Sequence, residues 1–178
     1  AKKFTNLGYV CVSLTYRTPR PLGLPIYQSG WQDGQRAVRL VRQSAKKRGF
    51  DPEKIGVLGF SAGGHLTVLL GTSALTPAYD PVDAVDEIPC HVILAVPIYV
   101  AYALTDGLTG PNTRSGDAID AKLSDVFKFD DKACPMALFH GGTDPYSPIG
   151  STQIYRQLRR MKIPAEVHLF ADRGHGFM

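Results

Sequence analysis

The chain has 178 residues, of which 44% are hydrophobic and 20% charged, and this size and composition predict one domain with its own apolar core. The net charge is +4, and the basic residues between Arg36 and Arg48 fall mostly opposite apolar positions on a helical wheel. They indicate a solvated helix face, because the interleaved aromatic residues of a nucleic-acid surface are missing. The longest apolar run, Val92–Leu104, is too short to span a bilayer.

The three cysteines, Cys11, Cys90 and Cys134, form no closely spaced pair. Cys11 lies inside an apolar run and Cys134 directly precedes one, so buried thiols are expected rather than a zinc site or a disulfide framework. No residues have the spacing of metal ligands, and we expect neither a metal nor a cofactor. Cysteine usage leaves the compartment open.

The first half of the chain alternates between predicted helices and strands. The expected elements are a helix at 1–6, a strand at 9–17, a loop at 18–30, a helix at 32–48, a strand at 55–60 and a helix at 62–70. Gly8, Gly49 and Gly71 follow the three helices as stop signals. The strand at 9–17, "YVCVSLTYR", is predicted from its β-branched and aromatic residues.

The second half continues the alternation. The expected elements are irregular chain at 72–90, a strand at 91–100, a loop with some helix at 101–132, a strand at 135–141, a helix at 151–161, a strand at 165–170 and a final glycine-rich loop. Strands that are apolar almost throughout belong to a parallel sheet covered by helices. The sequence therefore predicts an α/β domain with a mostly parallel sheet and helices on both faces.

The stretch "GFSAGG" at 59–64 lies between a predicted strand and a predicted helix. In that context a Gly-x-Ser-x-Gly pattern is typical of a turn that presents a serine nucleophile, here Ser61. Gly59 and Gly63 would leave room for the turn, and the backbone N–H of Ala62 would face a developing oxyanion. A plain tight turn is the alternative interpretation.

A serine nucleophile needs a base and an acid that orients the base. Asp144 in "HGGTDPYSP" follows one predicted strand and His175 in "DRGHGF" follows the next, at the sheet edge where sites of open α/β sheets lie. Asp172 is the alternative acid. His140 is expected to support the Asp144 loop. The remaining histidines are expected to pack or to belong to strands: His65, His91 and His168.

Taken together, the chain resembles the α/β-hydrolase superfamily, and within it bacterial carbohydrate acetylesterases and xylan-esterase-like lipases and esterases. The matching stretches are "YVCVSLTYR", "DPEKIGVLGFSAGGHL", "LFHGGTDPYSP" and "IPAEVHLFADRGHGF", in family order over nearly the whole chain. The resemblance implies that Ser61 is the nucleophile, His175 the base and Asp144 the acid.

The chain also departs from the family pattern. No HGGG-type oxyanion segment precedes Ser61, and the first three family strands and the last helix are missing. We therefore expect residues 1–178 to be a single catalytic domain that is incomplete at both ends. An empty strand position would then separate 9–17 from 55–60, and direct pairing of these two strands is the alternative. Losing one oxyanion donor costs roughly 3–4 kcal/mol of transition-state stabilisation.

The expected function is that of a serine carboxylesterase acting on small acyl esters, chiefly acetyl esters, of carbohydrates such as xylan. Candidate pocket residues are Trp31, Tyr99, Tyr102 and Tyr146. The expected partner is a small-molecule ester, and exposed strand edges add the expectation of a homodimer. A prolyl-oligopeptidase-type serine peptidase domain and a non-catalytic binding module are the two alternatives.

Overall fold

The computed structural model describes residues 2–18, 22–105 and 120–178, and its centre is a four-stranded parallel sheet. The strands are β1 (Gly56–Phe60), β2 (Leu94–Ile98), β3 (Met136–Gly141) and β4 (Ala165–Phe170). Their order in the sheet, β1-β2-β3-β4, repeats their order in the chain. The four predicted strands after residue 55 are therefore confirmed, although β2 is shorter than the apolar run that predicted it.

The predicted helices before β1, between β1 and β2 and between β3 and β4 are confirmed. The helices are the short α1 (Lys2–Thr5), α2 (Gln28–Arg48), α3 (Ala62–Thr72), the 3-10 helix η1 (Ala84–Glu87) and α4 (Ile149–Arg160). Helix α3 runs past Gly71, which was expected to end it. A Cβ at Gly71 would lie 2.6 Å from the Met136 side chain and 3.0 Å from Ala95. This glycine therefore serves close packing of helix on sheet, not termination.

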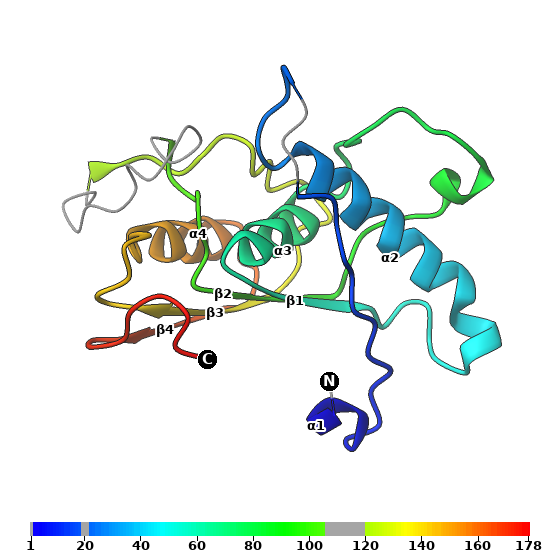
Figure 1. Cartoon of the computed structure of the whole chain (residues 1–178), viewed down its shortest axis with the longest axis horizontal. Coiled ribbons are helices and arrows are strands. Elements are labelled where there is room, and N and C mark those ends of the chain that lie inside the picture. Colours follow the sequence, from blue (N-terminus) through cyan, green and yellow to red (C-terminus); the bar gives the residue numbers. More distant parts are fainter. Residues whose placement is uncertain (1, 19–21, 106–119) are drawn as a thin grey trace.

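Figure 1 shows α2, α3 and α4 on one face of the sheet. The core lies between these helices and the strands, where Leu69 of α3, Leu138 of β3 and Ile154 of α4 are fully buried. On the opposite face Leu58, Phe60 and Leu94 are each more than two-fifths exposed. Helices were expected on both faces, and within the described ranges the three long helices cover only one.

Residues 9–17 do not form the predicted strand. The segment is extended, its apolar side chains at Val10 and Val12 are exposed, and the one sheet neighbour of β1 is β2. High β-propensity reflects packing against neighbouring strands, and no strand lies beside this segment to pair with it. Direct pairing with β1 is therefore excluded for the described residues. Cys11, expected to be buried here, is exposed as well, whereas Cys90 and Cys134 are buried.

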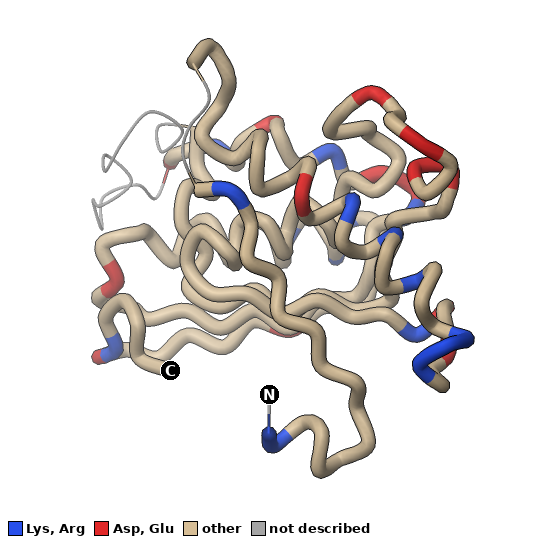
Figure 2. The backbone as a smooth tube through the Cα atoms, turned by 45° about the vertical axis from the view of Figure 1, so that its right-hand side comes forward, with Lys and Arg blue, Asp and Glu red and all other residues tan. Residues whose placement is uncertain are grey.

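The basic face of α2 is only partly the solvated face that was predicted. Lys46, Lys47 and Arg48 are exposed, but Arg42 is buried, and its guanidinium donates to the carbonyls of Pro52 and His91 at 3.0 and 2.7 Å. Figure 2 shows the acidic stretch around η1 beside the basic residues of this helix. Arginines of α2 therefore hold the chain that leads into β2, which the helical wheel alone could not reveal.

Candidate active site

Ser61 occupies a strained turn between β1 and α3. Its φ of 56° and ψ of −118° lie outside the regions that L-residues prefer. Backbone bonds fix this geometry, since the Ser61 N–H donates to Ile98 at 3.0 Å and the Ser61 carbonyl accepts from His65 and Ala101. The Ser61 side chain does not cap α3. Its hydroxyl is therefore free to face the carboxyl edge of the sheet.

Two glycines of the turn are required for close contact, and they differ from the predicted pair. A Cβ at Gly59 would lie 2.2 Å from the carbonyl oxygen of Gly63, and a Cβ at Gly64 would lie 2.9 Å from that of Ile98. At Gly63 the nearest neighbour would be the Tyr16 hydroxyl at 4.0 Å. The prediction that Gly63 relieves crowding is wrong, and Gly64 has that role. The second glycine of the pair in "GFSAGG" is the feature of the sequence that could have indicated this role.

The structure brings Ser61, Asp144 and His175 together. The Ser61 hydroxyl lies 2.8 Å from His175 Nε2, and His175 Nδ1 lies 2.9 Å from the nearer Asp144 oxygen. An ionised carboxylate only accepts, so Nδ1 carries the ring proton and Nε2 is left to accept from the serine. This arrangement can remove the serine proton and stabilise the imidazolium that results. Asp172, the alternative acid, is exposed and forms no hydrogen bond to His175.

The Asp144 carboxylate is buried and stays ionised. Burial alone would raise its pKa, but hydrogen bonds from His175 and the Tyr146 N–H, together with the nearby His140 imidazole, outweigh that effect and hold the pKa below its usual range. The Tyr146 N–H donates to Oδ1 at 2.8 Å, which closes a turn around the carboxylate. The site therefore contains a negative charge at neutral pH, directed at His175.

The loops that carry the acid and the base cross at close range. A Cβ at Gly141 would lie 2.0 Å from the Arg173 carbonyl oxygen, and a Cβ at Gly142 would lie 2.6 Å from that of Ala171. The Thr143 N–H donates to Arg173 at 3.1 Å across this crossing. The "HGG" at 140–142 is therefore what lets the two loops meet. The two glycines are visible in the sequence, but the reason for them is clear only once the loop at 171–173 is known to lie against them.

Three of the four candidate pocket residues gather around His175. Tyr99 and Tyr146 flank the imidazole, with ring centroids 4.8 and 5.0 Å from it, and Tyr102 contacts Tyr146. Tyr99 is itself buried, so it supports the histidine more than it offers a surface. Trp31 is buried in the core beside Tyr27, with ring centroids 6.3 Å apart. The expectation that Trp31 lines a pocket wall is not met.

Ala62 is the first residue of α3. The first N–H groups of a helix have no partner within it, and the helix dipole favours negative charge at this end. The structure thus places the predicted oxyanion donor next to Ser61. His65, which was expected to pack, is buried as predicted. Its Nδ1 donates to Ala101 at 3.1 Å from within the core, and burial lowers the pKa of its ring to about 4.

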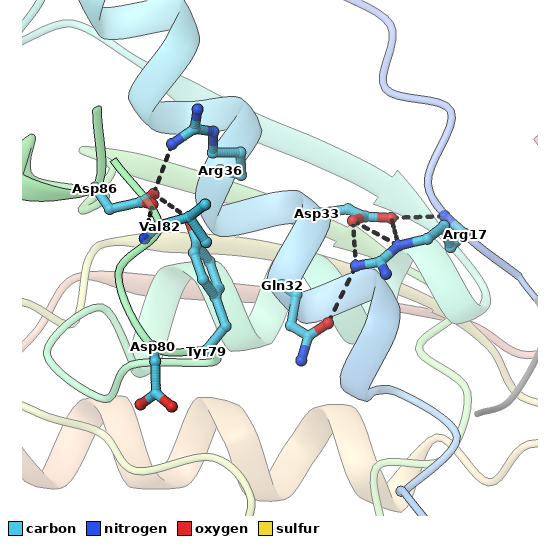
Figure 3. A pocket seen from close by; sticks show the side chains of 8 residues that line it. All are labelled: Arg17, Gln32, Asp33, Arg36, Tyr79, Asp80, Val82 and Asp86. Carbon is cyan, nitrogen blue, oxygen red and sulfur yellow. Dashed lines mark hydrogen bonds and ion pairs between the residues drawn. The ribbon is translucent and has the colours of Figure 1, made fainter. Parts of the chain in front are cut away.

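A cavity of about 360 Å³ lies away from these residues, between α2 and the chain around Tyr79 (Figure 3). Arg17 pairs with Asp33 at 2.7 Å, and Arg36 pairs with Asp86 at 3.0 Å. No member of the serine, histidine and aspartate set lines this cavity. Its two arginines are paired with two of its three aspartates, so we interpret it as a structural junction and not as the reaction site.

Within the described ranges, no three or more His, Cys, Asp or Glu side chains come together as a metal site. Over the same ranges, no helix has the length and apolar character that crossing a membrane requires.

Comparisons with known proteins agree with this architecture. The chain is 36% identical over 154 residues to an acetylxylan esterase of Xylanibacter ruminicola, covering 82% of this chain and 30% of that protein. An acetyl ester-xyloside bifunctional hydrolase from Caldicellulosiruptor lactoaceticus is 28% identical, with a TM-score of 0.65 over 83% of this chain and 57% of that one. An α/β-hydrolase enzyme from a Medee basin deep-sea metagenome, MGS-M1, is 25% identical, with a TM-score of 0.61 over 83% and 50%.

The chain thus spans about half the length of these two solved structures, and its fold is that of the α/β-hydrolases. The BD-FAE family model matches residues 1–158. Because this match includes most of the 178 residues, the chain belongs to the BD-FAE family.

Proposed function

We propose that this chain is the catalytic part of a serine carboxylesterase. The observation that carries the proposal is the continuous hydrogen-bonded series from the Ser61 hydroxyl through His175 to the buried Asp144 carboxylate. Such a series on a strained turn beside a helix N-terminus supports nucleophilic catalysis. The similarity to an acetylxylan esterase supports small acyl esters, chiefly acetyl esters of carbohydrates, as the substrate class.

The reaction would proceed through an acyl-enzyme. His175 Nε2 takes the proton of the Ser61 hydroxyl while Oγ attacks the ester carbonyl carbon, and the Ala62 N–H donates to the oxyanion. Collapse of the tetrahedral intermediate breaks the ester C–O bond, and His175 returns the proton to the departing alcohol. Water activated by His175 then attacks the acyl carbon, which releases the acid and restores the serine.

The experiment that tests this proposal is intact-mass measurement after treatment with a serine-directed organophosphonate. We expect one adduct on the wild-type chain and none on Ser61→Ala, because phosphonylation needs an activated serine. A folded wild-type chain that takes no label would overturn the proposal and favour a non-catalytic binding module. Turnover of nitrophenyl acetate, butyrate and octanoate beside a panel of peptide amides then separates a short-chain esterase from a serine peptidase.

A further inference from the structure

His140 is a fully buried histidine beside the proposed reaction site that the mechanism above does not use. It lies at the end of β3, and its side chain has no solvent exposure. Buried histidines are retained where their two ring nitrogens have partners, because an unsatisfied polar group in the interior is costly. The two ring nitrogens of His140 contact two different elements.

Their partners define the tautomer of His140. Its Nε2 lies 2.8 Å from the carbonyl oxygen of Tyr146, which can only accept, so Nε2 carries a proton. Its Nδ1 lies 2.7 Å from the hydroxyl of Ser151, a fully buried residue of α4. The Ser151 hydroxyl can donate to a neutral ring. Ser151 thus favours the neutral tautomer with its proton on Nε2.

That proton faces the segment that forms the Asp144 site. His140 Nε2 lies 3.5 Å from Asp144 Oδ2, on side chains with no exposure. The carbonyl that His140 binds belongs to Tyr146, whose own N–H donates to Asp144 Oδ1 and whose ring flanks His175. One imidazole therefore touches the acid directly and also holds the residue that turns the acid toward the base.

We propose that His140, fixed by Ser151 as the Nε2–H tautomer, is a positioning residue that orients the Asp144 carboxylate toward His175. This inference rests on the proposed function, because it concerns the same site. An apolar side chain of similar size would fill the space but would leave the Tyr146 carbonyl unsatisfied. The carboxylate would then lose one of the contacts that fix its rotation, and His175 would lose its alignment with Ser61.

The two amide substitutions of His140 test this geometry, because each places an NH₂ group near one ring nitrogen. His140→Gln reaches toward the Nε2 position and His140→Asn toward the Nδ1 position. We expect His140→Asn to lower kcat for nitrophenyl acetate about 100-fold with KM changed less than about threefold, since small displacements of catalytic groups have effects of this order. We expect His140→Gln to restore kcat to within about tenfold of wild type. His168→Gln, on the exposed face of β4, is the matched control and should leave kcat unchanged.

Ser151→Ala supplies a milder test if the buried substitutions at His140 fail to fold. It removes the donor to His140 Nδ1 and leaves His140 in place, so we expect kcat to fall about tenfold. Because the buried Nδ1 is then unsatisfied, a moderately lower melting temperature is expected as well, with the chain still folded at the assay temperature. A folded His140→Asn or Ser151→Ala variant with wild-type kcat would overturn the inference. So would equal losses in His140→Asn and His140→Gln, because packing alone would then explain the effect.

A readout that needs no turnover separates this inference from the proposed function. Long-range ¹H–¹⁵N spectra of the histidine-labelled chain, assigned with His140→Gln, should show His140 protonated at Nε2. They should also show the signal of a hydrogen-bonded Nδ1 proton of His175, and this signal should be weaker in Ser151→Ala. A His140 protonated at Nδ1 alone overturns the inference even in an active enzyme. If the wild-type chain takes no phosphonate label while His140 has the expected tautomer, the proposed function fails and the positioning geometry stands.

Discussion

The proposed site combines two segments that are held in different ways. Asp144 has a fully buried side chain whose position is set by hydrogen bonds from His175 and the Tyr146 N–H and by the neighbouring His140 imidazole. His175 lies on the loop after β4, where its side chain is 27% exposed and its main supports are the rings of Tyr99 and Tyr146. Apart from the hydrogen bonds that join Ser61, His175 and Asp144, the acid is held by directional contacts in the interior and the base by aromatic packing at the surface.

This difference teaches where the site is preorganised and where it can move. Directional bonds to a buried carboxylate fix its orientation and cost no reorganisation during a reaction. Ring contacts define a position more loosely, but they leave the imidazole accessible to the ester and to the water that must later reach it. We therefore expect substitutions on the acid side to be more damaging than substitutions around the base loop.

The largest effect is expected for Asp144→Asn. The amide fills the same space but cannot hold His175 with its proton on Nδ1, so kcat/KM for nitrophenyl acetate should fall about 10⁴-fold. Asp172→Asn is the matched control, because this nearby carboxylate is exposed and should be dispensable. Equal losses in the two variants would contradict the assignment of Asp144 as the acid.

The next effect concerns the turn that carries Ser61. An added Cβ at Gly64 would meet the Ile98 carbonyl oxygen at 2.9 Å, and that carbonyl also receives the Ser61 N–H, so Gly64→Ala should displace the nucleophile and lower kcat about 100-fold. Gly63→Ala is the control, since the nearest atom to an added Cβ there would be the Tyr16 hydroxyl at 4.0 Å, and kcat should change less than about threefold. A damaging Gly63→Ala beside a neutral Gly64→Ala would reverse the interpretation of the turn.

A smaller effect is expected on the base side. Phe177 packs edge-on against Tyr99 and is tilted against Phe170, with ring centroids 5.5 and 5.2 Å apart, and aromatic pairs contribute about 0.5–1.5 kcal/mol each. Phe177→Ala should therefore release the loop and lower kcat about tenfold, with faster amide hydrogen exchange at residues 174–176. Phe4→Ala, in α1, is the control. Unchanged exchange and unchanged kcat would show that Phe177 does not hold the base.

The smallest effect on activity is expected for substitution of His65, which is buried in α3 behind the Ser61 turn. Here the predicted effect is on stability. The pKa of His65 is lowered to about 4, so between pH 6.5 and 4 the unfolded chain binds a proton that the folded chain excludes. The free energy of unfolding therefore decreases as the pH is lowered through this window. The loss across this window should approach about 3 kcal/mol. Urea unfolding at pH 7, 5.5 and 4.5 measures it, and a flatter profile is expected for His65→Asn, which can still donate to Ala101.

Asp144 does not interfere with that measurement. A lowered carboxyl pKa contributes stability that is present above its unfolded value near 3.9, and this contribution is lost only as the pH falls through the folded-state pKa. Identical pH profiles for the wild-type chain and His65→Asn would exclude His65 as the source of the loss.

The sequence predicted the elements that carry the site because their signals are local. A strand, the "GFSAGG" turn and a helix are contiguous in the chain, and Asp144 and His175 each follow a strand of a parallel sheet, so their meeting follows from topology. The prediction of a strand at 9–17 failed because pairing needs a neighbour, which no property of that segment supplies. The prediction that Trp31 lines a pocket failed for a related reason. The sequence of a helix does not show whether an aromatic side chain faces the core or a pocket, and Trp31 of α2 faces the core.

The tertiary contacts around the site were the least predictable part. Arg42 and Lys47 are alike in charge and lie on the same helix, yet one is buried against backbone carbonyls and the other is exposed. Gly63 and Gly64 are adjacent and identical, and only the crossing of α3 over β2 distinguishes them. Such differences depend on which segment lies opposite, and a single sequence does not contain that information.

The agreement between sheet order and chain order has a consequence for folding. Because each strand pairs with the strand before it in the chain, the sheet can be assembled by adding one strand at a time, each addition closing the crossover between two consecutive strands. In that sequence the Ser61 turn and the Asp144 loop are in place before β4 docks, and the His175 loop arrives after it. A chain in which β4 has not docked would therefore hold the Ser61 hydroxyl without its base, and the proposed hydrolysis would require the last strand to be in place.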